Sequence, residues 1–264
     1  MSIITISRGS YYRGKEVAEK VAQKLGYQCI SRDTVVEELE QFQLSEVKLV
    51  RGLHDAVSVL ERISYGKERF IVNIRWSLLE HFRRDNIVYH GLAGHFFVRD
   101  LSHVLKVRII ADLETRVIEE MARENISAQQ ARTILKKDDE ERRKWSLYLY
   151  GIDTWNPAQY DMVLNIGAIT TDDAAEIITN TIHLPRFNTT PDSQRKIENL
   201  ALAAKVQSSL FEYPSAQVMA RDGSVVVTIK APLDQKQEII ANVENIVKNI
   251  AEVDGIEVRF EPYL

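Results

Sequence analysis

The chain has 264 residues, which is enough for one large domain or for a medium-sized domain followed by a small one. Its formal net charge of −4 excludes a global basic field, so we expect no nucleic-acid partner. The single cysteine, Cys29, excludes an intrachain disulfide framework and fits a reducing compartment. No apolar run approaches the ~20 residues that cross a bilayer, so we expect a cytoplasmic protein with no integral membrane segment.

The first strand and the loop after it carry the strongest local signal. Residues 3–6 (IITI) predict a strand, and residues 14–25 predict an amphipathic helix that Gly26 ends. Between them, the sequence follows the Gly-x4-Gly-Lys spacing of a phosphate-binding P-loop, although an ordinary strand-to-helix turn would have the same pattern. Free amides and the helix dipole would favour an anion there. The predicted nucleotide-binding residues are Arg8, Gly9, Ser10, Tyr11, Tyr12, Arg13, Gly14, Lys15 and Glu16.

Strand and helix patterns alternate over the rest of the first 184 residues. Further strands are predicted at residues 28–30, 86–90, 105–110 and 161–165. Helices are predicted at residues 34–40, 46–84 with breaks near Gly52 and Gly66, 113 onward, 127–148 and 172–182. This alternation is typical of an α/β fold with a doubly wound, five-stranded parallel sheet covered by helices on both faces. Ligands of such folds bind beyond the carboxyl ends of the strands, where Arg8, Asp33, Gly91 and Asp112 fall.

Several polar side chains have an ordinary structural interpretation. Ser31 or Asp33 could cap the helix that follows them, Asp112 could cap the helix from residue 113, and Thr171 or Asp172 could cap the next one. Three histidines show no metal-ligand spacing and are interpreted as structural: His54, His90 and His95. Three aromatic residues fit a buried stripe of one helix better than a stacking site for a base: Trp145, Tyr148 and Tyr150.

A second, smaller unit is predicted after residue 184. Residues 185–193 contain two prolines and read as a linker. Helices are then predicted at residues 194–212 and 233–250, and strands at residues 216–221, 225–230 and 256–260. Asp222-Gly223 between two alternating runs is a strong hairpin signal. The predicted domains are therefore residues 1–184, a linker at residues 185–193, and a small α-β-β-α-β domain at residues 194–264.

The first ~185 residues resemble the cytidylate kinase-like family of P-loop nucleoside monophosphate kinases. Ile6-Ser7-Arg8, Lys15-Glu16-Val17-Ala18 and Ser31-Arg32-Asp33 match the family's phosphate loop and the aspartate after its second strand. The lid region is more specific, and its matching residues are Asp139-Glu140-Glu141-Arg142, Trp145, Tyr148, Tyr150, Trp155, Pro157 and Tyr160-Asp161. Two departures concern activity: Tyr11-Tyr12-Arg13-Gly14 replaces the usual Gly-Ser-Gly-Gly, and Gly91-Leu92 replaces Gly-Arg.

The resemblance implies a transferase that binds ATP and a nucleoside monophosphate, CMP being one candidate acceptor. It implies that Lys15 holds the donor phosphates and that Arg142 clamps the transferred phosphoryl group. Asp33 would bind a metal-bound water or activate the acceptor phosphate, with a plain helix cap as the alternative. The implied acceptor-binding residues are Asp33, Gly91, Arg132, Arg142 and Arg143. For Arg142 and Arg143, a solvated helix face paired with residues 138–141 is the alternative.

Glu16 replaces the hydroxyl residue that usually binds Mg2+ after the lysine. We therefore assign no protein metal ligand and expect Mg2+ to be held mainly by nucleotide phosphates and water. Arg8 would face the phosphate loop or pair with a nearby carboxylate.

Residues ~194–262 resemble a BON-like domain, a class associated with protein or membrane-surface interaction. The partner could be a protein, a lipid surface or a second copy of the chain, and a ligand-sensing role is equally open. Three functions follow: a nucleoside monophosphate kinase, a catalytically degenerate nucleotide-binding sensor that signals through residues 194–264, and a P-loop kinase of a non-nucleotide acceptor.

Overall fold

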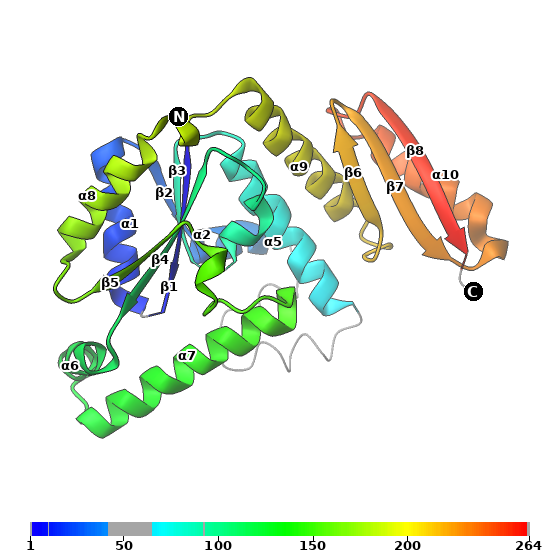
Figure 1. Cartoon of the computed structure of the whole chain (residues 1–264). Coiled ribbons are helices and arrows are strands. Elements are labelled where there is room, and N and C mark those ends of the chain that lie inside the picture. Colours follow the sequence, from blue (N-terminus) through cyan, green and yellow to red (C-terminus); the bar gives the residue numbers. More distant parts are fainter. Residues whose placement is uncertain (1, 10, 42–64, 92, 263–264) are drawn as a thin grey trace.

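The computed structural model describes residues 2–9, 11–41, 65–91 and 93–262, without the side chains of residues 11, 12, 40, 41 and 262. Its larger sheet has five strands in the order β2-β3-β1-β4-β5, and every neighbouring pair is parallel. The strands are β1 (Ile3–Arg8), β2 (Gln28–Ser31), β3 (Ile87–His90), β4 (Val104–Ala111) and β5 (Met162–Ile166). The five-stranded parallel sheet predicted from the sequence is confirmed (Figure 1).

Helices cover both faces of this sheet. Helices α1 (Tyr11–Leu25) and α8 (Thr171–Ile182) cover one face, and α2 (Arg32–Gln41) and α5 (Gly66–Phe82) cover the other. Two further helices, α6 (Leu113–Glu124) and α7 (Ala128–Tyr150), follow β4 in the chain. Within β1, Ile3 packs into the core on the α2 and α5 side, whereas Ile4 and Ile6 pack against α1 and α8. A strand that is buried on both faces reads as a continuous apolar run, which is why residues 3–6 show no polar alternation.

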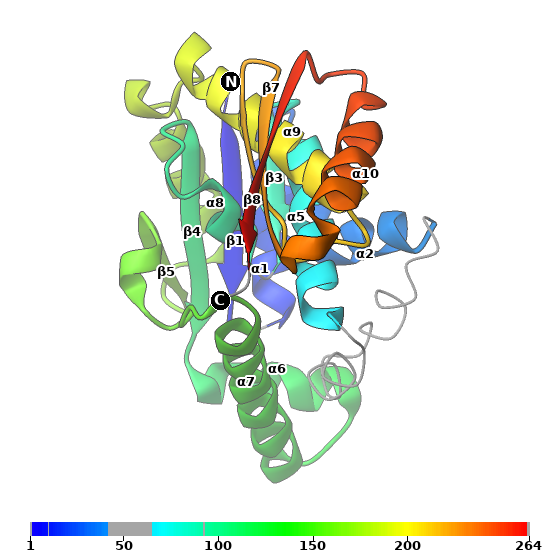
Figure 2. The ribbon, with the colours of Figure 1, turned by 90° about the vertical axis from the view of Figure 1, so that its right-hand side faces the viewer.

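Helices α6 and α7 lie beyond the carboxyl ends of the strands, at the lower end of the molecule in Figure 2. The polar helix α7 begins with a capping box in which Ser127 and Gln130 bond each other's backbone N–H groups. It ends at Gly151, whose φ of 65° is a conformation that glycine adopts without strain. The capping box and Gly151 thus set the start and the end of the helix that carries Arg142.

The structure changes several local predictions. Helix α1 begins at Tyr11 instead of residue 14, because Tyr-Tyr-Arg has ordinary helix propensity and lacks the flexible residues that would hold a loop open. Helix α8 is capped by Thr170, whose side chain accepts from the Asp173 N–H, so the predicted caps Thr171 and Asp172 were wrong. Asp112 occupies the N-cap position of α6 but makes no side-chain cap bond.

Ser31 acts as the predicted cap before α2, since its Oγ accepts from the Thr34 N–H at 3.1 Å. Of the helices predicted over residues 46–84, only α5 falls within the described residues. The helix prediction over residues 46–64 lies outside them, as do His54 and Gly52. No helix in the described ranges is long and apolar enough to cross a membrane.

A three-stranded sheet follows, in the order β6-β7-β8. Its elements are β6 (Gln217–Arg221), β7 (Ser224–Ala231), α10 (Lys236–Lys248) and β8 (Gly255–Pro262). The predicted Asp222-Gly223 hairpin is confirmed, because both residues have positive φ and β6 pairs antiparallel with β7. Strand β8 then pairs parallel with β7, which requires the α10 crossover.

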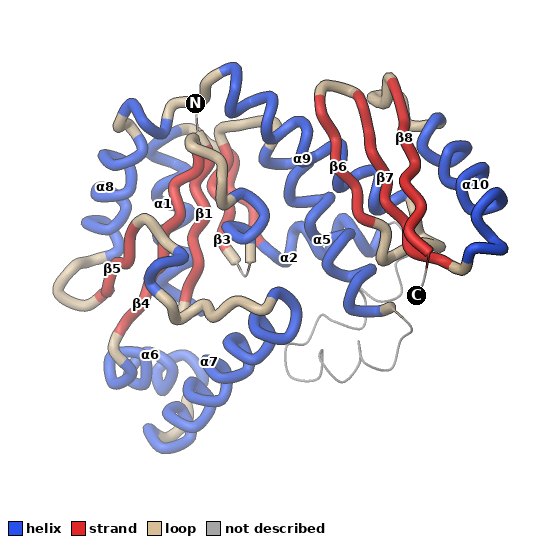
Figure 3. Tube along the Cα trace, turned by 45° about the vertical axis from the view of Figure 1, so that its right-hand side comes forward, coloured by secondary structure: helices blue, strands red, loops and turns tan. Residues whose placement is uncertain are grey.

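Helix α9 (Pro191–Ser209) joins the two sheets, and it lies between them in Figures 1 and 3. Its side chains Ile197, Ala201 and Ala204 are buried in the same core as α5. Leu202 and Val206 are buried against β7 and α10 instead. One helix therefore belongs to both cores.

Residues immediately before α9 also pack against the larger sheet. Residues Pro185–Phe187 form a single 3-10 turn, and Phe187 is buried against the α1 and α8 side of the large sheet. The predicted linker at residues 185–193 thus contributes one side chain to the first core and the first turn of α9. The three-part division at residues 184 and 194 remains a prediction.

Candidate functional site

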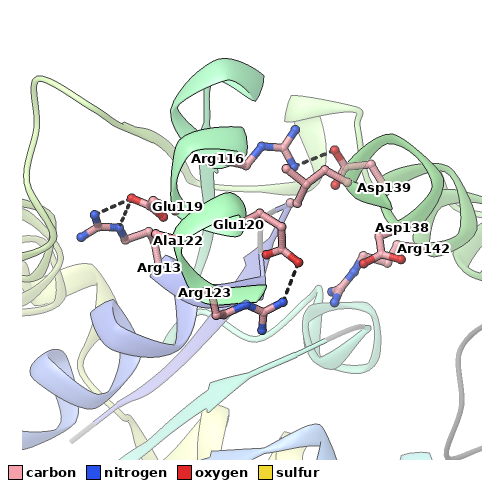
Figure 4. Close-up of a pocket in the computed structure, with 11 residues that line it drawn as sticks. Arg13, Arg116, Glu119, Glu120, Ala122, Arg123, Asp138, Asp139 and Arg142 are labelled. Carbon is pink, nitrogen blue, oxygen red and sulfur yellow. Dashed lines mark hydrogen bonds and ion pairs between the residues drawn. The ribbon is translucent and has the colours of Figure 1, made fainter. Parts of the chain in front are cut away.

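A cavity of about 620 Å³ opens at the carboxyl end of β1, between the start of α1 and helices α6 and α7 (Figure 4). Its lining combines four arginines with four carboxylates: Arg13, Arg116, Arg123, Arg142, Glu119, Glu120, Asp138 and Asp139. Gly9 forms part of its floor. A volume in this range accommodates a small-molecule ligand.

Most of these opposite charges pair with each other across the cavity walls. Arg13 Nε donates to Glu119 Oε1 at 2.8 Å and joins α1 to α6, and Arg116 meets Asp139 at 2.7 Å and joins α6 to α7. Arg123 pairs with Glu120 at 2.7 Å within α6. The arginines are thus held at the cavity by carboxylates, which an incoming polyanion could replace as partners.

Arg142 is the cavity arginine whose pKa burial lowers. Burial lowers the pKa of its guanidinium, and the positive charges of Arg8 and Arg32 lower it further, against the opposing effect of Asp138 and Asp139. An arginine stays protonated despite such a shift. Guanidinium groups from β1, α2 and α7 therefore lie within electrostatic reach of one another, and a phosphate between them would relieve their repulsion.

Glycine 14 sets how closely α1 approaches β1. A Cβ added to Gly14 would lie 2.7 Å from the Cβ of Arg8, which is shorter than any tolerated contact. Gly9 donates its N–H to the Ile109 carbonyl at 3.1 Å and ties the turn to β4. Only residues 9 and 10 separate the end of β1 from the start of α1, so the connection is shorter than the predicted open loop. Ser10 lies outside the described residues.

Lys15 and Glu16 lie in the second turn of α1. The Lys15 side chain is 57% exposed and meets Glu19 at 3.6 Å. Glu16 pairs with Lys20 at 3.0 Å and accepts a hydrogen bond from Thr171 at 2.7 Å. Burial alone would raise the pKa of Glu16, but the bonds from Thr171 and Lys20 outweigh it and lower the pKa. Glu16 thus fixes α1 to α8.

The ends of β2 and β3 bring a second group of predicted residues to the same edge. Burial, Arg8 and Lys15 lower the pKa of His90 to about 4, opposed by Asp33. His90 and Asp33 therefore lie within electrostatic reach of the predicted phosphate-binding cations. Gly91 is packed tightly, since a Cβ there would meet the Tyr89 hydroxyl at 2.7 Å and the Arg32 Cβ at 2.9 Å.

Two predicted acceptor-binding arginines point elsewhere. Arg132 forms an ion pair with Glu114 at 2.6 Å, and both side chains are exposed. Arg143 meets Asp153 at 2.6 Å and lies 4.5 Å from the ring centre of Trp155. Neither residue lines the cavity, so of the three arginines only Arg142 reaches it.

An adjoining cavity of about 430 Å³ shares Gly9, Arg116 and Asp139 with the first one. Arg108 on β4 lines it, is buried, and donates to the Tyr160 hydroxyl at 3.2 Å. Tyr160 in turn donates to Ser7 at 3.2 Å. Arg108 was not among the predicted site residues, although a single arginine inside the apolar run of residues 105–110 was a usable signal.

Arg32, Arg116 and Arg123 were also missed. Arg32 was part of the Ser31-Arg32-Asp33 motif, but no role of its own was predicted for it. Arg116 and Arg123 occur on a charged amphipathic helix, where most arginines face solvent, and only the packing of α6 against α7 brings them to the cavity.

The observed fold agrees with comparisons to known proteins. A family model described as the cytidylate kinase-like family matches residues 3–168. A cytidylate kinase of Archaeoglobus fulgidus is 28% identical over 191 residues, which are 70% of this chain and 96% of the relative. A cytidylate kinase of Sulfolobus acidocaldarius is 24% identical over 167 residues, covering 63% of this chain and 86% of the relative.

Among solved structures, an uncharacterized protein of Eubacterium ventriosum aligns with a TM-score of 0.53 and 18% identity. The alignment covers 69% of this chain and 97% of the other one. At this identity the likeness concerns the fold alone. The matched residues 3–168 of the family model end before α8, so it does not reach α9 or the smaller sheet.

Proposed function

Because a family model matches well over half of the chain, the protein belongs to the cytidylate kinase-like family, and from this premise we propose that it is an ATP-dependent nucleoside monophosphate kinase. CMP is the first acceptor to test, since both of the similar relatives described above are cytidylate kinases. An acceptor phosphate oxygen would attack the γ-phosphorus of ATP, the bond to the β–γ bridging oxygen would break, and ADP would leave. The observation that carries the proposal is the half-buried Arg142, which lines the cavity within electrostatic reach of Arg8 and Arg32.

Phosphoryl transfer depends mainly on positioning and on neutralising charge at the phosphates. Arg142 would stabilise the transferred group, because its charge is buried at the cavity and stronger there than in water. Arg8 and Arg32 would meet the acceptor phosphate at the ends of β1 and β2. Lys15 would turn toward the donor phosphates, and its exposed pair with Glu19 is weak enough to exchange.

Mg2+ would neutralise the donor phosphates. It prefers oxygen ligands and retains several waters. The described residues contain no group of three or more His, Cys, Asp or Glu side chains placed to hold a metal ion. We therefore propose that phosphate oxygens and water supply most of its ligands, with Asp33 as the nearby carboxylate that could hold a metal-bound water.

The test is ATP turnover with CMP, UMP, AMP and GMP as acceptors, measured as ADP release. Arg142→Met should lower kcat/KM for the preferred acceptor by about 100-fold or more, because a buried positive charge at the transferred group is lost. Lys144→Met, an exposed position on the same helix, should retain wild-type turnover. Equal loss in both variants, or no loss in Arg142→Met, would contradict the assignment.

A specific observation favours a second candidate, the nucleotide-binding sensor without catalysis. Gly14 and Lys15 lie inside α1, and Lys15 pairs with Glu19 on the exposed helix surface. Measurable ATP binding with no transfer to any of the four acceptors would support this candidate. Phosphorylation of a non-nucleotide acceptor would support the third, in which Leu92, outside the described residues, alters the acceptor side.

The smaller sheet has no assigned activity. Its α-β-β-α-β order is the one predicted for a BON-like unit. We propose that residues 194–264 serve sensing or interaction, and that α9 is the element through which they act on the kinase core.

A further inference from the structure

A groove of about 940 Å³ lies where α9 joins the two sheets. The turn Gly94–Val98 and helix α5 form one wall, α9 forms the floor, and edge strand β6 forms the other wall. Strand β6 is the strand of the smaller sheet nearest to the larger one in Figures 1 and 3. The groove shares no lining residue with the cavity at Arg142.

The groove is lined with more cations than anions. Five lining side chains are basic and three are acidic, although the whole chain has a net charge of −4. Arg195 and Lys196 share one carboxylate, Asp192, at 3.4 and 2.9 Å. The local excess of positive charge favours an anionic occupant.

Arg75 on α5 is the least compensated of these cations. It is half-buried, and no hydrogen bond or ion pair joins its guanidinium to any residue that the structure describes. Burial lowers its pKa, with no carboxylate acting against that effect. A half-buried charge without a partner costs stability, so its position is explained if a ligand supplies the missing negative charge.

Aromatic rings form the neighbouring part of the wall. Phe96 and Phe97 are half-buried and line the groove. The guanidinium of Arg99 lies 5.5 Å from the ring centre of Phe96. Rings and guanidinium planes of this kind stack on flat heterocycles, whereas the guanidinium groups also bind phosphate.

We propose that this groove is a second ligand site that binds a nucleoside phosphate, with the phosphate at Arg75 and the base against Phe96 and Phe97. Its volume and mixed apolar and cationic lining suit a ligand of that size and chemistry. The site is separate from the proposed kinase site.

The experiment is isothermal titration of the full chain with the four common nucleoside triphosphates and their monophosphates. The wild-type protein should bind at least one of these nucleotides at two classes of site with different affinities. Arg75→Met should weaken one class by at least ten-fold and leave the other class detectable, whereas Arg142→Met should do the opposite. A single class in wild type for every nucleotide, or a second class indifferent to Arg75→Met, would overturn the proposal.

Two controls test the roles of Arg75 and of the aromatic wall separately. Arg259→Met makes the same chemical change on exposed strand β8, away from the groove, and should leave both classes intact. Tripolyphosphate, which has no ring, should bind the Arg75-dependent class at least ten-fold more weakly than the nucleotide, and equal affinity would overturn the role of the aromatic wall. If the kinase proposal is wrong, no acceptor is phosphorylated, and the Arg75-dependent class of binding remains.

Discussion

Two buried histidines near the ends of β3 make the stability of the fold depend on pH. Burial and nearby cations lower the pKa of His90 to about 4 and that of His95 to about 3, from an ordinary value of 6.5. Between pH 6.5 and these values, the unfolded chain binds protons that the folded chain does not. The free energy of unfolding therefore falls as the pH is lowered, by up to about 2 kcal/mol per histidine at pH 5.

Urea unfolding at pH 7, 6 and 5 measures this effect. His90→Gln should show a smaller loss of stability between pH 7 and 5 than wild type, whatever its stability at pH 7. His183→Gln removes an exposed histidine and should retain the wild-type dependence. A full wild-type loss in His90→Gln would show that this side chain is not held neutral by the fold.

The contact of Gly14 with Arg8 predicts a strong effect of one added methyl group. Gly14→Ala would place a Cβ 2.7 Å from the Arg8 Cβ, so α1 or Arg8 must move. We expect a loss of roughly 1–3 kcal/mol in stability and weaker ATP binding by titration. Gly167→Ala is the matched control, because nothing lies within 4 Å of the added atom. Similar effects of the two substitutions would contradict the steric argument.

At the scale of elements, α9 links the unfolding of the two sheets. Ile197→Ala removes contacts on the α5 side, and Val206→Ala removes contacts on the β7 side. Since both side chains are fully buried, each variant should lose about 1–4 kcal/mol. Both should lower the midpoint of one shared transition in urea, followed by circular dichroism and by tryptophan fluorescence.

Ser209→Ala, at an exposed end of the same helix, should change the midpoint little. Two separate transitions, with Val206→Ala shifting only one of them, would contradict this link. The smaller sheet would then unfold independently of the larger one.

The sequence predicted those elements whose pattern is decided locally. The central strands β1, β3 and β4 were visible because strands buried on both faces form apolar runs. The hairpin at Asp222-Gly223 was visible because its turn needs positive φ at both positions. The early start of α1 was not visible, since a motif suggested a loop where the residues have ordinary helix propensity.

The role of α9 could not be predicted because it depends on two cores at once. Residues 197 and 206 lie on different sides of one helix, and a single sequence does not show which apolar stripe meets which sheet. The residues of the candidate site also fall into two groups, those with a local sequence signal and those that depend on tertiary packing. Arg142 was marked by an uncommon local pattern, whereas Arg116 and Arg123 reach the cavity only through the packing of α6 against α7.

At the scale of the whole molecule, one set of aromatic contacts joins the groove to the kinase cavity. Tyr150, the last residue of α7, lies 5.3 Å from Phe96 and 5.7 Å from Phe97 between ring centres. Arg142 lies two turns earlier on the same helix. A ligand that moves the groove's aromatic wall would therefore act on the helix that carries the proposed catalytic arginine.

This arrangement predicts that the two sites are energetically coupled. A nucleotide in the groove should change the affinity for ATP at the Arg142 cavity by about 5-fold or more, and ATP should change the affinity of the groove by the same factor. Tyr150→Leu should remove most of this coupling because it deletes the ring that both phenylalanines contact. Leu147→Ala, an exposed position on α7, should retain it. Titrations with one site already saturated measure both factors, and no change in either affinity, or full coupling in Tyr150→Leu, would contradict the connection through α7.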